Sequence, residues 1–429
     1  MVSVYGMTAD VVTADRSRPG PGSAIVVGGG IVGLSTAWFL QERGVEVTVV
    51  DRAGVAGGAS WGNAGLIAPG LVPLHEPAML RHGLSSLVRP TGLPGDAAVA
   101  DPALGGFLAR VAANRRWSSW TRAVRANLPF TEESVDAFEV LTANGVDSPI
   151  VAASVVAAFR TMRQAEGLLG VLDRLAEVGT PVTHTGLFGS AVRDQVPLAS
   201  PELAVGVCIE DQRYVDSTDF TKALARSVVA RGGVLHTLDA TDVQAHRGGV
   251  SVRTGAGPRL EADAVVFATG AHLPYLAARC GVRQRLRTSH GFSLTVPVDR
   301  RVPSPIYLPE AGVTCTPCEN GMRVATTVGF RSATRDPSAR VRSVVVAVRP
   351  LLDGVRWHER GEVRNGVNVT TADGRPLIGA TAAPGVYVAG GHDMWGFANG
   401  PVTGRLLAEL ITTGRQPASL RAFDPRRAL

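Results

Sequence analysis

The chain has 429 residues, of which 45% are hydrophobic and 50 are glycine, and its formal net charge is +6. This length and composition argue against a disordered or fibrous protein and favour an α/β enzyme of two intertwined domains. The positive charge comes from arginines scattered along the sequence, without a basic stripe interleaved with aromatic residues. We therefore expect no nucleic-acid partner.

Residues 1–22 lack the basic start and continuous apolar core of a signal peptide, and they end in a Pro/Gly-rich hinge. This pattern predicts a disordered lead. No run of about 20 apolar residues occurs, so the sequence predicts no transmembrane segment. We expect a cytoplasmic protein, and peripheral contact with a membrane stays open.

Cys315 and Cys318 have the spacing of a redox pair or of half a metal site. A zinc site needs more ligands, and no second such pair or suitable histidine pair is near them. We therefore expect two ordinary thiols on strand-like segments and no bound metal.

The first regular elements form a strand–turn–helix–strand unit. Residues 24–27 are a short apolar strand, residues 31–43 have the apolar spacing of a helix, and residues 45–50 form a second strand. Gly44 suits the position just after the helix, and Asp51 ends the second strand.

Further along, residues 101–180 have a mostly helical pattern, and Asp216 or Ser217 can cap a helix that extends through Arg231. Residues 286–350 alternate as an antiparallel sheet does, and we include the segment VRSVVVAVRP in that sheet. Pro401 suits the first turn of the last helix.

These elements predict a nucleotide-binding domain built from three separated segments, with a second, substrate-binding domain inserted in two pieces. The predicted segments are 23–100, 200–285 and 363–418 for the first domain, and 101–199 and 286–362 for the second.

The strongest motif is Gly28-x-Gly30-x-x-Gly33, which stands between the first strand and the first helix. The first glycine makes a tight turn, the second lets backbone approach a pyrophosphate, and the third lets helix and strand pack closely. Asp51 stands where a carboxylate accepts hydrogen bonds from an adenosine ribose. The complete unit indicates dinucleotide binding at a helix N-terminus.

The stretch GVAGGASWGNAGLIAPG (54–70) resembles the segment after the second strand in the D-amino acid oxidase superfamily of FAD-dependent oxidoreductases. The resemblance is closest to the D-amino acid dehydrogenase and glycine oxidase branch, and it extends to VVFATGAH, HGFSLTVP, TADGRPLIG and AGGHDMWGFANGP. It implies a Rossmann-like FAD-binding domain of the glutathione reductase type 2-like kind. The inserted α+β substrate domain is then built on an antiparallel sheet.

The same resemblance implies which residues bind FAD. The backbone near Val243 would hold the adenine, and the loop 396–399 would lie by the N1–C2=O edge of the flavin. The full implied set is Gly28, Gly30, Ile31, Val32, Gly33, Asp51, Arg52, Ser60, Asn63, Ala64, Gly65, Leu66, Val243, Ala268, Thr269, Gly270, Gly396, Phe397, Ala398 and Asn399.

The resemblance implies oxidation of a C–N bond in an amine or amino-acid-derived substrate, by hydride transfer to flavin N5, giving an imine. Oxygen or another electron acceptor would then reoxidise the flavin. Three alternatives stay open: a tailoring enzyme of secondary metabolism acting on a modified amine without a free α-carboxylate, a non-catalytic flavin-binding protein, and a peripheral membrane dehydrogenase that passes electrons to quinone.

The expected substrate site departs from the family pattern. Amino-acid-oxidising members carry an arginine a few residues before the T-x-D-G turn, where this chain has Asn368, and glycine oxidase-like members carry a second one where it has Met394. These arginines bind the substrate carboxylate. Either Arg287 or Arg323 substitutes for them, or the substrate is not a plain α-amino acid.

We expect Asp393, Met394 and Trp395 to face the substrate, and His392 to hold the turn. The candidate catalytic residues are His290, Asn368, Met394 and Trp395.

Overall fold

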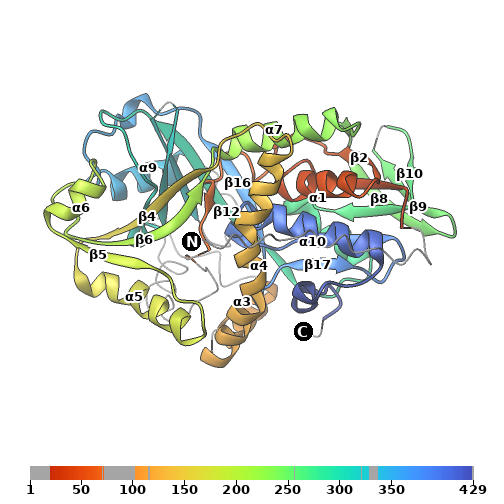
Figure 1. Ribbon diagram of the computed structural model, residues 1–429, viewed down its shortest axis with the longest axis horizontal. Coiled ribbons are helices and arrows are strands. Elements are labelled where there is room, and N and C mark those ends of the chain that lie inside the picture. Colours follow the sequence, from red (N-terminus) through yellow and green to blue (C-terminus); the bar gives the residue numbers. More distant parts are fainter. Residues whose placement is uncertain are drawn as a thin grey trace, which may run out of the picture.

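The computed structural model of this protein describes residues 20–69, 71, 102–114, 116–255, 257–319, 321–327 and 337–427. Most of the lead predicted at 1–22 lies outside these residues. The described residues form two lobes, each built around one large β-sheet, and helix α4 (Trp117–Ala143) lies between them (Figure 1).

The first lobe contains a six-stranded sheet with the order β17-β18-β11-β1-β2-β7. The predicted first unit is present as β1 (Ser23–Val27), α1 (Ile31–Glu42) and β2 (Glu46–Val50). The central strands run parallel, and β17 alone is antiparallel to its neighbour. The remaining strands are β7 (Val234–His236), β11 (Ala264–Phe267), β17 (Leu377–Ala380) and β18 (Val386–Gly390).

Both faces of this sheet are covered, which explains why its strands read as continuous apolar runs. Ala24 and Val26 pack toward α1, α7 (Ser217–Ala230) and α10 (Gly400–Thr413). Ile25 and Val27 belong to a second core with α8 (Leu273–Arg279) and the small antiparallel sheet of β8 (Ala240–His246), β9 (Gly249–Thr254) and β10 (Leu260–Ala262).

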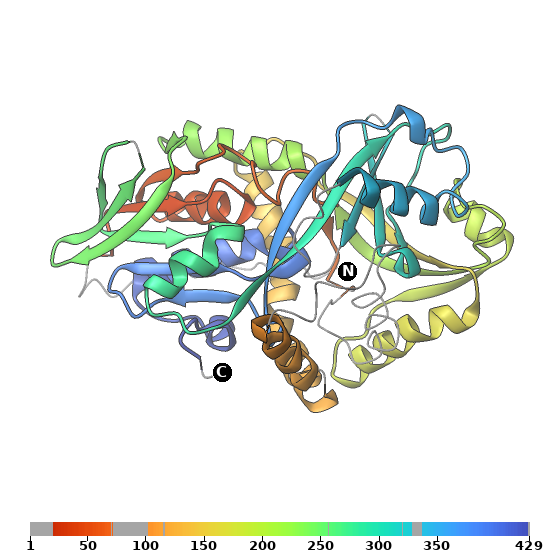
Figure 2. The same cartoon turned by 180° about the vertical axis from the view of Figure 1, so that it is seen from behind.

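The second lobe is a nine-stranded, mostly antiparallel sheet with the order β16-β12-β15-β14-β13-β4-β6-β3, in which β5 also pairs with β6. Figure 2 shows its long strands β12 and β16 crossing between the lobes. The strands are β3 (Leu66–Ile67), β4 (Val151–Phe159), β5 (His184–Phe188), β6 (Val205–Tyr214), β12 (Leu286–Val296), β13 (Ile306–Leu308), β14 (Val313–Cys318), β15 (Gly321–Thr327) and β16 (Arg364–Thr371).

The predicted α/β class is confirmed, and the large sheet has the antiparallel character expected of the second domain. The strands β3, β6 and β16 fall within the segments predicted for the first domain, yet they pair in the large sheet. The domain boundaries themselves stay a prediction. Within the described part of the chain, every helix is too short or too polar to cross a membrane.

One local prediction was wrong, and another missed a strand. The segment VRSVVVAVRP lies largely in a helix, α9 (Pro337–Val348). Val341 and Val348 lie on the same face of that helix and are buried. The mostly helical pattern predicted for residues 101–180 is present as α3 (Pro102–Asn114), α4 and α5 (Met162–Glu177). The strand β4, buried over its C-terminal half, was missed there. A short apolar run can form either a helix or a strand, and the sheet or core that it packs against decides which one forms.

The two cysteines of C-T-P-C both lie on β14. Burial raises the pKa of the Cys315 thiol to about 12, so this thiol stays protonated and is a poor nucleophile or ligand. Cys318 is only partly buried.

The two lobes are joined by an ion pair at the start of α7. The Asp216 carboxylate caps this helix by accepting hydrogen bonds from the backbone N–H groups of Thr218 (2.9 Å) and Asp219 (3.1 Å). Arg323, on β15 of the large sheet, lies 3.2 Å from the same carboxylate and donates to Ser217 Oγ at 2.8 Å. One side chain therefore caps a helix of the first lobe and pairs with a strand of the second.

We predict that Asp216→Ala lowers the free energy of unfolding by about 2–4 kcal/mol, because it removes the cap and leaves the largely buried Arg323 unpaired. Urea denaturation of the flavin-loaded protein measures this. Asp219→Ala is the matched control, since Asp219 is exposed in the same helical turn, and it should cost no more than about 0.5 kcal/mol. Equal losses in the two variants would contradict the account.

Candidate active site

The glycines of the first turn let three pieces of backbone come together. Gly28 has a φ of +124°, and a side chain there would clash with the carbonyl oxygen of Ala268, the residue that follows the neighbouring strand β11. A side chain at Gly33 would clash with the carbonyl oxygen of Gly28. The turn can therefore form only without side chains at these positions.

The first turn of α1 opens beside this contact. Gly30 is the N-cap residue, and no side chain caps the helix from that position. The backbone N–H of Ile31 donates to Ser60 Oγ at 3.0 Å, which holds the 54–70 segment against the helix end. Asp51 accepts hydrogen bonds from the backbone N–H groups of Gly29 (2.8 Å) and Ala53 (2.7 Å). A helix N-terminus and a carboxylate thus lie side by side.

A cavity of about 540 Å³ extends from this turn along the carboxyl ends of the parallel strands to β16 of the large sheet. Most of the residues implied by the resemblance line it. They are Gly28, Gly30, Ile31, Val32, Asp51, Arg52, Ser60, Asn63, Ala268, Thr269, Gly270, Gly396 and Phe397, together with Asn368 from the substrate set.

Seven implied cofactor residues lie outside the lining of this cavity, and two of them, Ala398 and Asn399, line a smaller cavity instead. Gly33 packs against Gly28, and Gly65, with a φ of +72°, approaches the carbonyl oxygen of Val215. Val243 lies on β8 outside the lining, and residues 238–241 line the cavity instead. Ala64 and Leu66 also lie outside the lining.

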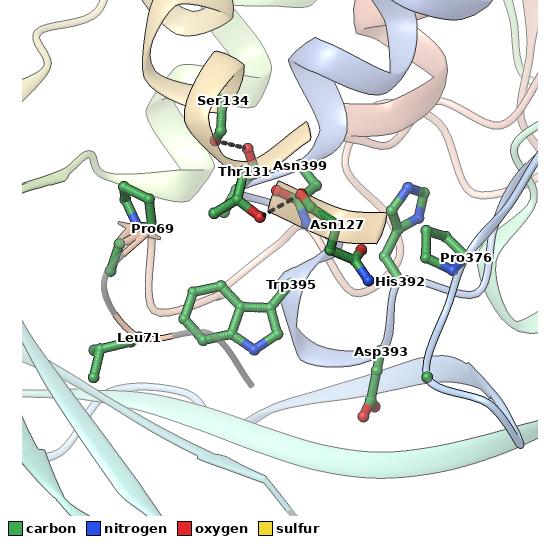
Figure 3. Close-up of a pocket in the computed structure, with 13 residues that line it drawn as sticks. Pro69, Leu71, Asn127, Thr131, Ser134, Pro376, His392, Asp393, Trp395 and Asn399 are labelled. Carbon is green, nitrogen blue, oxygen red and sulfur yellow. Dashed lines mark hydrogen bonds between the residues drawn. The ribbon is translucent and has the colours of Figure 1, made fainter. Parts of the chain in front are cut away.

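A second, smaller cavity adjoins the first (Figure 3). Its walls come from residues near Ala68, from α4 and from the C-terminal loop. Trp395, Ala398 and Asn399 line this cavity, and His392 and Asp393 line both cavities. The two cavities therefore meet at His392 and Asp393.

Helix α4 supplies polar residues that the sequence reading missed. Asn127, Thr131 and Ser134 line the second cavity, and their spacing places them on one face of the helix. Ser134 Oγ donates to the carbonyl oxygen of Ala398 at 2.8 Å, which ties α4 to the C-terminal loop. Buried polar residues on one helical face were the available signal, but only tertiary packing shows which loop they meet.

The expected substrate residues are spread over both cavities. Asn368 lines the large cavity, while Trp395 lines the small one, and the indole Nε1 of Trp395 is buried without a hydrogen-bond partner among the described residues. His290 lies in the middle of β12, opposite Val367, and neither His290 nor Met394 lines either cavity.

The two arginines considered as replacements differ in their surroundings. Arg323 already binds Asp216 and Ser217 at the junction of the lobes. Arg287 lies on β12 opposite Thr370 and outside the lining of both cavities. Among the described residues that line the small cavity, none is an arginine or a lysine.

His392 holds the C-terminal loop from inside. The hydroxyl of Thr403 donates its single proton to the carbonyl oxygen of Asn399 at 2.6 Å, so His392 Nε2, at 2.9 Å, must donate to Thr403 Oγ1. This fixes the neutral tautomer with the proton on Nε2. Burial lowers the pKa of His392 to about 4, so the ring is uncharged at neutral pH.

A family model described as FAD dependent oxidoreductase matches residues 23–410. The chain belongs to this family. It is 30% identical to a D-amino acid dehydrogenase of Methylobacterium nodulans, over 92% of this chain and 96% of that one. It is 31% identical to a D-amino acid dehydrogenase of Xylella fastidiosa, over 94% of this chain and 95% of that one.

Among solved structures, the fold is similar to that of glycine oxidase from Geobacillus kaustophilus, with a TM-score of 0.74 and 20% identity, over 96% of this chain and all of that one. The predictions of family, enzyme class and FAD as cofactor are confirmed. The large cavity of this FAD-dependent oxidoreductase fits that cofactor, because the glycine turn leaves room for a phosphate group beside the N-terminus of α1. No metal-binding group of His, Cys, Asp and Glu occurs among the described residues.

The buried His392 predicts a pH dependence of stability. Its folded-state pKa of about 4 lies below the ordinary value of 6.5, so the unfolded chain takes up a proton first as the pH falls. The contribution of His392 is complete above pH 6.5 and is lost as the pH falls toward 4. We expect a loss of about 2 kcal/mol by pH 5.

Urea denaturation at pH 7.5 and pH 5.0 measures this loss, with His392→Gln as the matched control because glutamine keeps a donor but does not titrate. The wild-type protein should lose about 2 kcal/mol more than the variant between the two pH values. Parallel losses in both proteins would rule out His392 as the cause.

Proposed function

We propose that this FAD-dependent oxidoreductase oxidises the C–N bond of an amine or amino-acid-derived substrate, giving an imine that water hydrolyses. The observation that carries the proposal is the pair of adjoining cavities, which connects the glycine turn with Asn368, Asp393 and Trp395. The names of the relatives, D-amino acid dehydrogenase and glycine oxidase, support an amine substrate. Bound FAD supplies the hydride acceptor.

The chain's own residues would hold the cofactor in three places. Backbone N–H groups at the start of α1 would bind the pyrophosphate, and the Asp51 carboxylate would accept from the adenosine ribose. The loop from Gly396 to Asn399, followed by the N-terminus of α10, would supply donors and a favourable dipole to the pyrimidine edge of the flavin.

The small cavity would hold the substrate against the C-terminal loop. Its described polar lining consists of amide, hydroxyl, indole and imidazole groups and the carboxyl group of Asp393. Such a lining orients a substrate and excludes water, which hydride transfer from an uncharged amine requires more than a strong base. If the substrate carries a carboxylate, that group would have to reach Arg287. Otherwise the substrate has no carboxylate.

The electron acceptor is a separate part of the proposal. Oxygen or another acceptor would take electrons from the reduced enzyme, and the dehydrogenase names of the relatives favour an acceptor other than oxygen. In the rival proposal, the protein would bind flavin in the same cavities but would not oxidise any substrate.

The central test is anaerobic reduction of the flavin. We predict that at least one amine or D-amino acid bleaches the flavin absorbance of the purified protein within seconds, because the proposed substrate and cofactor sites are two adjoining cavities. Admission of air then measures oxygen reactivity. A flavin that a broad panel of amines and amino acids leaves unreduced would support the non-catalytic rival and sink the proposal.

The cofactor assignment gives a second prediction. Asp51→Asn should weaken FAD binding by about tenfold, because it replaces a charged acceptor at the ribose position with a neutral amide. Titration of the cofactor-free protein with FAD, followed by fluorescence, measures the dissociation constant. The control is Asp263→Asn, since Asp263 accepts from the backbone of Gly22 and Ser23 outside the cavity, and it should leave the constant unchanged. An unaltered affinity in Asp51→Asn would contradict the assignment.

A further inference from the structure

The turn that follows β16 forms part of the wall of the small cavity. Gly374 and Pro376 line this cavity, and neither of them lines the large one. The turn, residues 372–376, connects β16 of the large sheet with β17 of the first lobe. Figure 3 shows Pro376 among the side chains around the cavity. The position of this turn therefore shapes the proposed substrate site without bordering the cofactor cavity.

Arg427 holds this turn from outside both cavities. Its guanidinium group donates two hydrogen bonds to the Asp373 carboxylate, from Nε to Oδ2 and from Nη2 to Oδ1, both at 3.0 Å. It also donates to the backbone carbonyl oxygens of Arg375 (2.7 Å) and Pro376 (3.0 Å). A planar fork of donors suits such a set of acceptors, whereas the compact ammonium group of lysine does not.

The ion pair between Arg427 and Asp373 is largely buried, with side chains that are 8% and 17% exposed. Burial by itself raises the pKa of the Asp373 carboxyl, but the hydrogen bonds and charge of Arg427, together with Arg375, lower this pKa below its ordinary value. Arg375 also contacts the carboxylate, at 2.8 Å. Because it cannot replace the bonds from Arg427 to the carbonyl oxygens, loss of Arg427 would loosen the backbone of the turn.

The segment that carries Arg427 is itself fixed to the protein. The 3₁₀ helix η5 (Ala418–Phe423) ends at the buried Phe423, whose ring centroid lies 5.2 Å from that of Phe130 on α4. Gln284 Nε2 donates to the backbone carbonyl oxygen of Arg427 at 2.8 Å. An arginine anchored in this way can position the turn that it contacts.

We propose that Arg427 is a positioning residue of this enzyme, which holds the 372–376 turn as a wall of the small cavity and thereby sets the affinity of that cavity for the substrate. This inference rests on the proposed oxidation of amines. Arg427 acts through the turn, since it lines neither cavity. Its loss should weaken substrate binding and leave FAD binding and the limiting rate of flavin reduction unchanged.

Arg427→Gln tests this role in the FAD-loaded protein, with D-alanine and pentylamine as probes. The concentration dependence of anaerobic flavin reduction gives a half-saturating concentration and a limiting rate for each compound. The variant should raise the half-saturating concentration about tenfold, because the loosened wall binds substrate less well. The limiting rate and the dissociation constant of FAD should change by less than about twofold.

The matched control is Arg426→Gln, the same substitution one residue earlier. Arg426 is 55% exposed and contacts Asp424, so this variant should keep the wild-type values. Arg427→Lys keeps the charge but not the fork, and its half-saturating concentration should lie between those of the wild type and Arg427→Gln. It also carries the test if the glutamine variant does not fold.

Hydrogen exchange supplies a readout that needs no turnover. The backbone N–H groups of Gly374 and Arg375 donate within the turn, to the carbonyl oxygen of Thr371 and to the Asp373 carboxylate. Mass spectrometry of a peptide that contains residues 371–377 should show about tenfold faster exchange in Arg427→Gln than in the wild type. Arg426→Gln should leave the exchange rate unchanged.

The outcomes separate this inference from the proposed function. An unchanged half-saturating concentration in Arg427→Gln, or a loss confined to FAD affinity, would overturn the role of Arg427 and leave amine oxidation standing. Equal effects of Arg426→Gln and Arg427→Gln would do the same. If neither probe reduces the wild-type flavin, a panel compound that does so takes their place. A flavin that no compound reduces would overturn the proposed function, and unchanged hydrogen exchange in Arg427→Gln would then overturn the inference as well.

Discussion

The architecture depends on one backbone contact, between the carbonyl oxygen of Gly28 and the main chain at Gly33. Because neither residue has a side chain, α1 starts close to the end of β1, and the backbone at Ala268, just after β11, passes close by. The helix N-terminus, the Asp51 carboxylate and the carboxyl ends of the parallel strands thereby border the same cavity. Ligands of open α/β sheets bind at this edge, where strand ends and helix starts converge.

The second requirement is a rigid C-terminal loop at the far end of that cavity. The neutral His392 ring, the Thr403 hydroxyl and the Asn399 carbonyl form a chain of hydrogen bonds inside the loop. Ser134 holds the loop from α4, and Ser289 contacts it from the large sheet. Elements from both lobes therefore position Asp393, which explains how a strained backbone conformation can persist there.

Local chemistry determined which features could be predicted from the sequence. The glycine turn, Asp51 and the cap at Asp216 follow from short-range backbone needs, so their spacing alone was informative. The helix α9 and the strand β4 were missed because a valine-rich run suits either state until its neighbours are known.

Tertiary packing accounts for what remained hidden at the candidate site. Residues 238–241 line the cavity and Val243 does not, and no sequence signal marks this difference. The polar face of α4 and the meeting of the two cavities at Asp393 arise from packing between segments far apart in the chain. Family resemblance predicted the loop, but not which of its side chains border the cavities.

The central claim is that cofactor and substrate occupy the two adjoining cavities and meet at Asp393. A crystal structure of the FAD-loaded protein with a bound amine or amino acid that reduces its flavin, prepared without an electron acceptor, tests it most directly. The account predicts the pyrophosphate against the N-terminus of α1, the flavin ring beside residues 396–399, and the amine in the small cavity. A flavin that lies elsewhere, or an amine bound outside the small cavity, would contradict the account.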